Sequence, residues 1–273
     1  MNTSPAEQFL IDFHNQQPGI TSHSFQSLSA TMSGQLYTSS YECLAKDVAS
    51  DATVLDLACG DGFLLSILPA RTLIGVDMST GELAAARQRL GDRTILHHGK
   101  AQSLPVENQR CDIVLCHMAL MLMDQLDDVL GEIQRVLKPS GHFSFVIGAA
   151  APPSAVMDAY ITRLRALYQH ESAKALRFGD QRLAKEESII STLTPYFTQI
   201  KIEKITISRR YTPDEVWSWF EGCYDLAFLA TEPRQQFHAA YLQELAALCE
   251  DDGKVAFADC MLKISARAAA HSH

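Results

Sequence analysis

Hydrophobic and polar positions in the first half of the chain predict strands and helices in alternation. Apolar runs that predict buried strands lie at residues 53–57, 72–76, 94–97, 111–116 and 142–147. Between them apolar residues recur at helical spacing, for example at Leu126, Val129 and Ile133. Strands that alternate with helices are typical of a parallel sheet with helices on both faces. Residues 40–148 therefore predict an α/β core.

The second half of the chain follows a different pattern. Helical spacing covers residues 154–170, 180–193 and 233–250, and strand patterns cover 200–207 and 255–265. The late strands predict completion of a three-layer α/β sandwich. We expect a seven-stranded, mostly parallel, Rossmann-like sheet whose last strand is antiparallel, with helical cap insertions. Residues 1–273 are thus expected to form a single domain.

Two short motifs mark helix starts. Ser4-Pro5-Ala6-Glu7 is a capping box with proline at the first helical position, and it predicts a helix over residues 5–15. Thr212-Pro213-Asp214-Glu215 predicts a second such start, before a segment rich in aromatic residues. Residues 16–39 are rich in Ser, Thr, Gln and Gly, and we expect them to be irregular.

Composition narrows the class of protein. The chain has 273 residues, 47% of them hydrophobic, which is enough for one large core. A formal net charge of −9 argues against a nucleic-acid partner, which normally requires a basic face. The seven cysteines form no CxxC pair and favour reduced thiols in a cytoplasmic protein. No apolar window approaches the ~20 residues of a membrane span, and MNTSPAEQFL does not resemble a secretory leader.

Glycines and acids gather where the first core strand becomes a helix. In open parallel sheets, ligands bind beyond the carboxyl ends of the strands. Gly60 and Gly62 lie in the first such turn, and Gly60 would let the backbone approach a ligand closely. Asp77 ends the second core strand, 21 residues after Asp56 (77 − 56), where a carboxylate can accept both hydroxyls of a ribose. The pattern predicts a nucleoside ligand.

The residues of this turn also indicate which kind of nucleoside ligand, a dinucleotide or one without phosphate, is expected. A dinucleotide fingerprint requires a third glycine where this chain has Leu65, and Asp61 would repel a pyrophosphate at the helix start. S-adenosylmethionine carries no phosphate, and its ammonium and sulfonium groups are cationic. Acids in the turn favour such a ligand. We therefore expect S-adenosyl-L-methionine as the cofactor rather than a nicotinamide dinucleotide.

Several motifs resemble those of class I S-adenosylmethionine-dependent methyltransferases of the small-molecule, type 11-like branch. Residues 56–62, DLACGDG, resemble the first motif, with Ala58 in place of a common glycine. The later motifs of that family resemble, in order, residues 74–79, 101–105, 111–114 and 130–141 of this chain. The resemblance covers residues 40–148 as the cofactor-binding core, and implies that residues 1–39 form a lid and that 149–273 add the remaining strands and cap.

The resemblance also implies roles for individual residues. Asp56, Ala58 and Gly60 would hold the methionine end of the cofactor, and Cys116 would lie beside it. Asp77 would bind the ribose. The adenine would lie against Met78, Ala101 and Gln102. Many relatives have aspartate where this chain has Lys100, and that acid accepts a hydrogen bond from the adenine amino group. Lysine has no acceptor, so we expect Gln102 or a backbone carbonyl to replace it.

Catalytic and substrate-binding candidates follow the core motifs. His117 lies directly after the fourth core strand and could act as a general base, or it could be a half-buried imidazole with a backbone role only. Trp217 and Phe220 could line a substrate cleft or pack an inserted helix, and Tyr37 is a further substrate-binding candidate in the lid. No residue spacing indicates a metal site.

The predicted reaction is transfer of a methyl group to an O, N or C atom of a small molecule. The segment Cys116–Ala119 lacks the Asn/Asp-Pro-Pro-Tyr/Phe sequence typical of enzymes that methylate DNA bases. Two alternatives remain open. One is a carboxyl methyltransferase that acts on an acyl group bound to a carrier protein, and the other is a cofactor-binding protein or cyclase without methyl transfer. A membrane partner is not expected.

Overall fold

The structure, a computed structural model, describes residues 3–170 and 178–269. The chain divides into two compact units. The first unit comprises Met1–Ala149, Arg177–Ile205 and Met261–His273, and the second comprises Ala150–Leu176 and Thr206–Cys260. Each unit is described below by itself.

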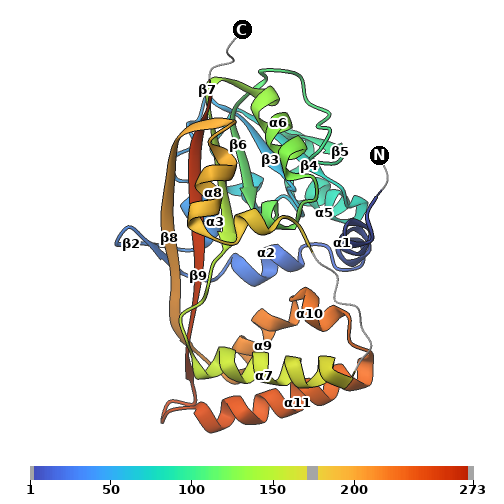
Figure 1. Cartoon of the computed structure of the whole chain (residues 1–273), viewed down its shortest axis with the longest axis vertical. Helices are drawn as coiled ribbons and strands as arrows, with labels where there is room; N and C mark the ends of the chain where they lie inside the picture. The colour runs from blue at the N-terminus through green and yellow to red at the C-terminus, as the bar shows by residue number, and fades with distance from the viewer. Residues whose placement is uncertain (1–2, 171–177, 270–273) are drawn as a thin grey trace. The chain divides into compact units, whose positions relative to one another are not determined.

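The first unit contains a parallel sheet that confirms the predicted fold class (Figure 1). Its parallel strands, in sheet order, are β7 (Leu137–Gly148), β6 (Cys111–His117), β3 (Thr53–Leu57), β4 (Thr72–Asp77) and β5 (Thr94–His98). β9 (Val255–Ala268) pairs with β7 in the antiparallel direction, as predicted, and β8 (Phe197–Tyr211) lies beyond it. The chain order therefore reverses between β3 and β6, where open parallel sheets bind ligands.

The sheet has nine strands rather than the predicted seven, because the lid segment is not wholly irregular. β1 (Ala30–Met32) and β2 (Gln35–Tyr37) form an antiparallel hairpin at the β8 edge. Ser33 and Gly34 form its two-residue turn, with φ of +50° and +79°. Two positive φ values are typical of a tight hairpin turn. Strands of three residues are too short to produce a recognisable alternation in the sequence.

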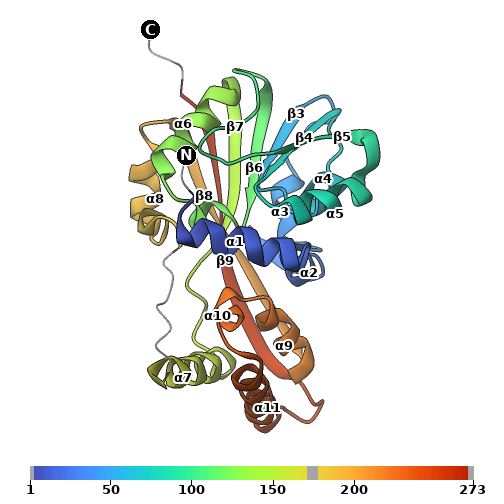
Figure 2. The same cartoon turned by 90° about the vertical axis from the view of Figure 1, so that its right-hand side faces the viewer.

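Helices cover both faces of the sheet (Figure 2). On one face, α6 (Leu126–Val136) and α8 (Glu186–Leu193) share a buried core with alternate residues of the strands, such as Leu55 and Leu57. The other helical layer consists of α3 (Ser40–Ala45), α4 (Phe63–Ile67) and α5 (Thr80–Leu90). Short 3₁₀ helices lie at Gly91–Arg93, Leu120–Leu122 and Gln181–Leu183.

The N-terminal segment begins with the two helices α1 (Pro5–Gln16) and α2 (Ile20–Phe25). The capping box at Ser4 and Glu7 is present as predicted, with both reciprocal hydrogen bonds. α1 lies against α5, and α1 and α2 run across the carboxyl ends of the central strands (Figure 2). These two helices thus lie where a nucleoside ligand is expected, and the lid role of residues 1–39 stays a prediction.

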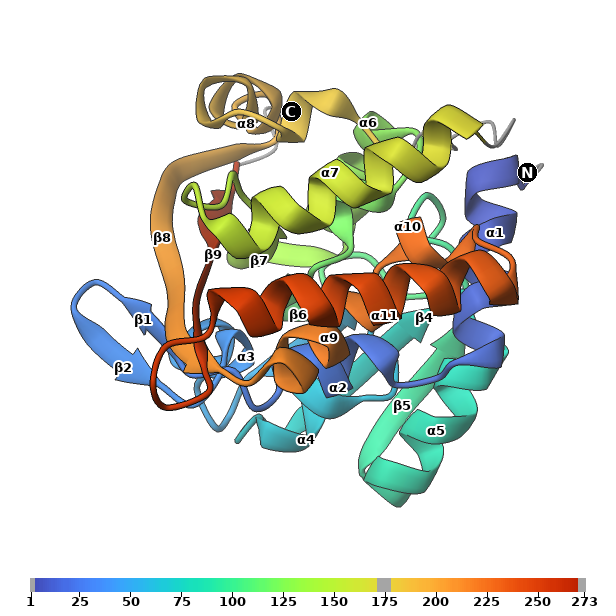
Figure 3. The ribbon, with the colours of Figure 1, turned by 90° about the horizontal axis from the view of Figure 1, so that it is seen from below.

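The second unit is a small helical assembly with an aromatic core. Its helices are α7 (Ala155–His170), α9 (Pro213–Glu221), α10 (Tyr224–Ala227) and α11 (Thr231–Leu248), and α7 lies beside α11 (Figure 3). The capping box at Thr212 is present as predicted. The ring of Tyr160 stacks on that of Phe220 at 4.0 Å between centroids. No helix in the described part of the chain has both the length and the apolar character to cross a membrane.

Candidate functional site

The turn after β3 places backbone amides at the carboxyl edge of the sheet. Ala58 and Gly60 have left-handed φ values of +58° and +52°. The amide of Cys59 donates to the carbonyl oxygen of Val76 at 3.1 Å, which anchors the turn to β4. A Cβ atom added at Gly60 would meet only the Glu82 side chain, at 3.7 Å. The backbone at Gly60 thus leaves room for close approach by a ligand.

Asp77 holds this turn together from the end of β4. One carboxylate oxygen accepts the Gly60 N–H at 2.9 Å, and the other accepts the Ser79 N–H at 2.8 Å. Burial raises the pKa of Asp77, while these two amides act in the opposite direction. A carboxylate has about four acceptor positions, so two remain for hydroxyl donors such as those of a ribose.

Asp56 is a buried carboxylate that no side chain or amide compensates. Its relative exposure is 2%, and it has no hydrogen-bond partner among residues 3–170 and 178–269. Burial, followed by the negative charges of Asp77 and Asp61, raises the pKa of Asp56 well above its usual range. An uncompensated buried carboxylate is costly, and a cationic group placed beside it would remove that cost.

Asp61, one of the acids expected to favour a cationic ligand, has several polar partners in this turn. Its carboxylate pairs with the Arg89 guanidinium and accepts the Ser22 hydroxyl at 2.7 Å and the Phe63 amide at 3.2 Å. The arginine neutralises this charge, and the serine belongs to the lid helix α2. Asp61 therefore fixes the lid to the turn, and Asp56 remains the uncompensated acid.

His117 is surrounded by residues of the N-terminal segment and of α3. Its Nε2 is 2.9 Å from the Ser40 hydroxyl, and its ring stacks on that of Tyr41 at 3.7 Å. Its Nδ1 is buried and has no partner within the described ranges. Burial lowers the pKa of His117 to about 3. The imidazole is thus neutral and weakly basic in this state, and the role of general base stays a prediction.

Replacing His117 with asparagine should remove a source of acid sensitivity. Above pH 7 the imidazole is neutral in both the folded and unfolded chains, whose pKa values are about 3 and about 6.5. Below pH 6.5 only the unfolded chain binds the proton, so stability falls as the pH drops. Between pH 7 and pH 5, His117 should cost about 2 kcal/mol of unfolding free energy, measurable by urea titration. Exposed His23 supplies the control, His23→Asn, which should keep the wild-type loss. Equal losses in wild type and His117→Asn would contradict this prediction.

The remaining predicted cofactor residues lie on neighbouring strands or directly after them. Met78 follows Asp77, and its carbonyl oxygen lies 3.1 Å from Nε2 of His98. Gln102 follows β5 and is buried beside Ala101. Cys116 is fully buried at the end of β6, on the sheet strand next to β3, and burial strongly raises the pKa of its thiol. These residues all lie on strands β3 to β6 or directly after them.

The three predicted substrate residues belong to other elements of the chain. Trp217 and Phe220 are in the second unit, where they are 7% and 2% exposed and pack in its aromatic core, for example against Phe237 and Tyr160. Tyr37 lies on β2, at the opposite edge of the sheet from β5, and is buried. The alternative reading, packing of an inserted helix, describes how Trp217 and Phe220 lie within their unit.

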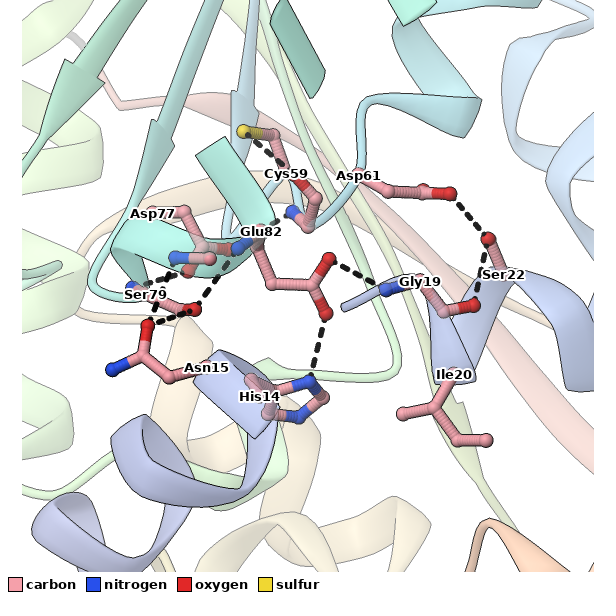
Figure 4. Close-up of polar contacts among 12 residues, drawn as sticks. His14, Asn15, Gly19, Ile20, Ser22, Cys59, Asp61, Asp77, Ser79 and Glu82 are labelled. Atoms are coloured by element: carbon pink, nitrogen blue, oxygen red, sulfur yellow. Dashed lines mark hydrogen bonds and ion pairs between the residues drawn. The ribbon is translucent and has the colours of Figure 1, made fainter. Parts of the chain in front are cut away.

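Sequence reasoning missed the polar contacts that fix the lid (Figure 4). Asn15 Oδ1 accepts hydrogen bonds at 2.9 Å from the Ser79 hydroxyl and from the Gly81 amide. The buried carboxylate of Glu82 lies 2.9 Å from His14 Nδ1 and accepts the Gly19 amide at 2.8 Å. These partners are more than 60 residues apart in the chain, and the sequence around one residue of a pair does not indicate its partner. Ser79 alone is recognisable, as the N-cap of α5.

The sheet order and the acidic ends of β3 and β4 define a Rossmann-like fold with a nucleoside-binding edge. Comparison with known families is more specific: residues 55–145 match the family model described as a methyltransferase domain. This match over part of the chain supports a methyltransferase domain of the class I type in this segment, with S-adenosylmethionine as the expected cofactor. The uncompensated Asp56, the open backbone at Gly60 and the spare acceptor positions of Asp77 fit that cofactor.

Curated relatives include two kinds of methyltransferase. A malonyl-[acyl-carrier protein] O-methyltransferase of Methylococcus capsulatus is 27% identical over 59% of this chain and 57% of its own length. A demethylmenaquinone methyltransferase of Symbiobacterium thermophilum is 36% identical over 33% of this chain and 40% of its own length. The chain thus spans about half the length of these relatives.

Solved structures with low sequence identity share the fold. The phosphoethanolamine N-methyltransferase 2 of Haemonchus contortus, solved with S-adenosylhomocysteine, has a TM-score of 0.54 and 18% identity over 94% of this chain and 59% of that one. The YcgJ protein of Bacillus subtilis has a TM-score of 0.52 and 19% identity over 84% of this chain and 97% of that one. Within the residues that the structure describes, no cluster of three or more potential ligands could hold a metal ion.

Proposed function

We propose that the protein transfers the methyl group of S-adenosylmethionine to a small-molecule acceptor. The observation that supports this most directly is the buried, uncompensated carboxylate of Asp56 beside the open backbone of Gly60. The α-ammonium of the cofactor would pair with Asp56, and its ribose hydroxyls would donate to the free acceptor positions of Asp77. The bound cofactor supplies an activated methyl group on a sulfonium centre.

The protein's own residues would act mainly by positioning and by excluding water. Helices α1 and α2 cross the strand ends; Ser22 ties them to the turn, and Asn15 and Glu82 tie them to the start of α5. The stacked rings of Tyr41 and His117 pack at the end of β6 and would help to exclude water there. Holding two reactants in line can supply effective molarities of ~10⁵ M or more. A base is required only where the acceptor keeps its proton at neutral pH.

Two alternatives differ in what receives the methyl group. The relative that acts on a malonyl-acyl carrier protein supports a carrier-bound carboxylate as an alternative acceptor. A small free metabolite remains the simpler proposal for the whole chain. A cofactor-binding protein or cyclase would use the same Asp56 and Asp77 contacts without transfer. All seven cysteines are free thiols, which supports the proposed cytoplasmic location.

Calorimetry and a transfer assay together test the proposal. Titration of the purified full chain with S-adenosylmethionine and S-adenosylhomocysteine should give saturable binding, whereas NAD should give none. Incubation with methyl-labelled cofactor and a small-molecule extract should then move label into a product. Label on an added acyl-carrier protein would favour the carrier-bound acceptor, and binding without transfer would favour the cyclase or binding protein. Binding of NAD but of neither sulfur ligand would overturn the assignment.

A further inference from the structure

Glu7 occupies an unusual position at the β5 end of the sheet. It is the third residue of α1 and is only 8% exposed, although it belongs to the N-terminal lid. Lys100 Nζ donates to its Oε2 at 2.8 Å, and Gln102 Nε2 donates to its Oε1 at 3.1 Å. The capping box adds the Ser4 amide, which donates to Oε2 at 3.2 Å. The lid thus delivers a carboxylate to the loop that follows β5.

The hydrogen bonds of Glu7 leave one acceptor position on Oε1. Each carboxylate oxygen can accept about two hydrogen bonds. Oε2 already accepts from Lys100 and from the Ser4 amide, whereas Oε1 accepts only from Gln102. Gln102 uses both of its amide hydrogens, the second one toward the Asp124 carbonyl oxygen at 2.9 Å. Glu7 Oε1 can therefore accept one more donor.

Sheet order indicates which donor would reach this position. Asp56 on β3 and Asp77 on β4 would hold the ammonium and the ribose of the proposed cofactor. The base and the amino-acid end leave the ribose from opposite sides. With the amino-acid end over β3, the base lies toward β5 and the loop of Lys100 and Gln102. An aminopurine presents its exocyclic amino group as a donor at its outer edge.

We propose that Glu7 accepts a hydrogen bond from the exocyclic amino group of the adenine. This inference rests on the proposed function, since it presupposes S-adenosylmethionine as the ligand. Lys100 has only donors and cannot recognise an amino group itself. Its ion pair with Glu7 instead holds the carboxylate in place, so that a lid residue supplies the acceptor that the β5 loop lacks. Adenine recognition and closure of α1 then depend on the same side chain.

A ligand that lacks one donor tests the contact directly. S-adenosylhomocysteine and its 6-deamino analogue, with purine in place of adenine, are titrated into the full-length wild type and Glu7→Ala by calorimetry. A hydrogen bond to a charged group should be worth about tenfold or more in affinity. Wild type should therefore lose about tenfold on removal of the amino group, and Glu7→Ala should lose about tenfold for S-adenosylhomocysteine. In Glu7→Ala the two ligands should bind within about threefold of each other, because the two changes remove the same interaction.

The controls separate this contact from loss of the helix cap. Glu215 is the same capping-box residue on α9, so Glu215→Ala should leave the preference for the amino group unchanged. Glu7→Gln keeps a neutral acceptor and should lie between wild type and Glu7→Ala. If Glu7→Ala binds both ligands more weakly but still prefers adenine by about tenfold, Glu7 only holds the lid and the inference is overturned. If wild type binds neither ligand, the proposed function fails instead.

Discussion

Asp56→Asn should stabilise the ligand-free protein and weaken S-adenosylmethionine binding by about a hundredfold. The substitution keeps the shape of the side chain but removes a buried charge that lacks a partner among the described residues. Removing it should raise the unfolding free energy at pH 7 by about 1–2 kcal/mol. The same change removes the counter-ion for the cofactor ammonium, which accounts for the loss of affinity. Urea unfolding and calorimetry measure the two effects.

The pH dependence of this stabilisation has a definite sign. Burial raises the pKa of Asp56 in the folded protein above the value of about 3.9 in the unfolded chain. Below pH 4 the carboxyl is protonated in both states, so Asp56→Asn should gain nothing there. As the pH rises from the unfolded-state pKa toward the higher folded-state pKa, only the unfolded chain loses its proton, so the wild type loses stability and the advantage of the variant grows. Cofactor binding should correspondingly release a proton from Asp56 and tighten as the pH rises.

Asp61→Asn is the matched control in the same turn. It makes the same chemical change at an acid that pairs with Arg89 and accepts from Ser22. Breaking that group of contacts should lower the unfolding free energy by about 1–3 kcal/mol. The two substitutions should therefore have opposite effects on stability. If Asp56→Asn destabilised the protein as Asp61→Asn does, or left cofactor affinity unchanged, Asp56 would not be the cation site.

Hydrophobic periodicity was sufficient to predict the core sheet, and it failed where local geometry decides the structure. The five parallel strands and the antiparallel final strand follow from apolar runs and their spacing. The fifth strand was predicted over residues 142–147, but β7 also includes the preceding segment, Lys138–Gly141. There Ser140 has a φ of +59°, and the pairing shifts between Cys111 and Ile113. An irregularity of this kind leaves no trace in the hydrophobic pattern.

The candidate site shows the same division between local and long-range information. Asp56, Gly60 and Asp77 could be predicted because they lie within two adjacent strand–turn segments whose spacing is visible in the sequence. Glu7 could be recognised only as a helix cap, because its partner Lys100 is 93 residues away. The partners of Asp61 could not be predicted for the same reason, since Arg89 and Ser22 reach it through the fold. The observed site therefore differs from the predicted one mainly in polar contacts between residues that are far apart in the chain.

Asp77→Asn should lower both stability and cofactor affinity, unlike Asp56→Asn. The wild-type carboxylate accepts the amides of Gly60 and Ser79, one on each oxygen. Asparagine has a single side-chain acceptor atom, so one of these amides would face an NH₂ group and lose its partner. An unsatisfied buried amide costs about 1–3 kcal/mol, which should appear in the unfolding free energy. Loss of the ribose acceptor and of the turn geometry should together reduce S-adenosylhomocysteine affinity by about a hundredfold.

Asp112→Asn separates the ligand effect from the loss of a backbone contact. Asp112 also accepts a backbone amide, that of Thr53 at 2.9 Å, and its other oxygen accepts from Lys138 at 2.7 Å. It lies at the start of β6, away from the carboxyl ends of the strands, so this variant should lose some stability and keep its cofactor affinity. Circular dichroism would establish that Asp77→Asn remains folded during the titration. A folded Asp77→Asn that binds S-adenosylhomocysteine as the wild type does would show that the ribose lies elsewhere.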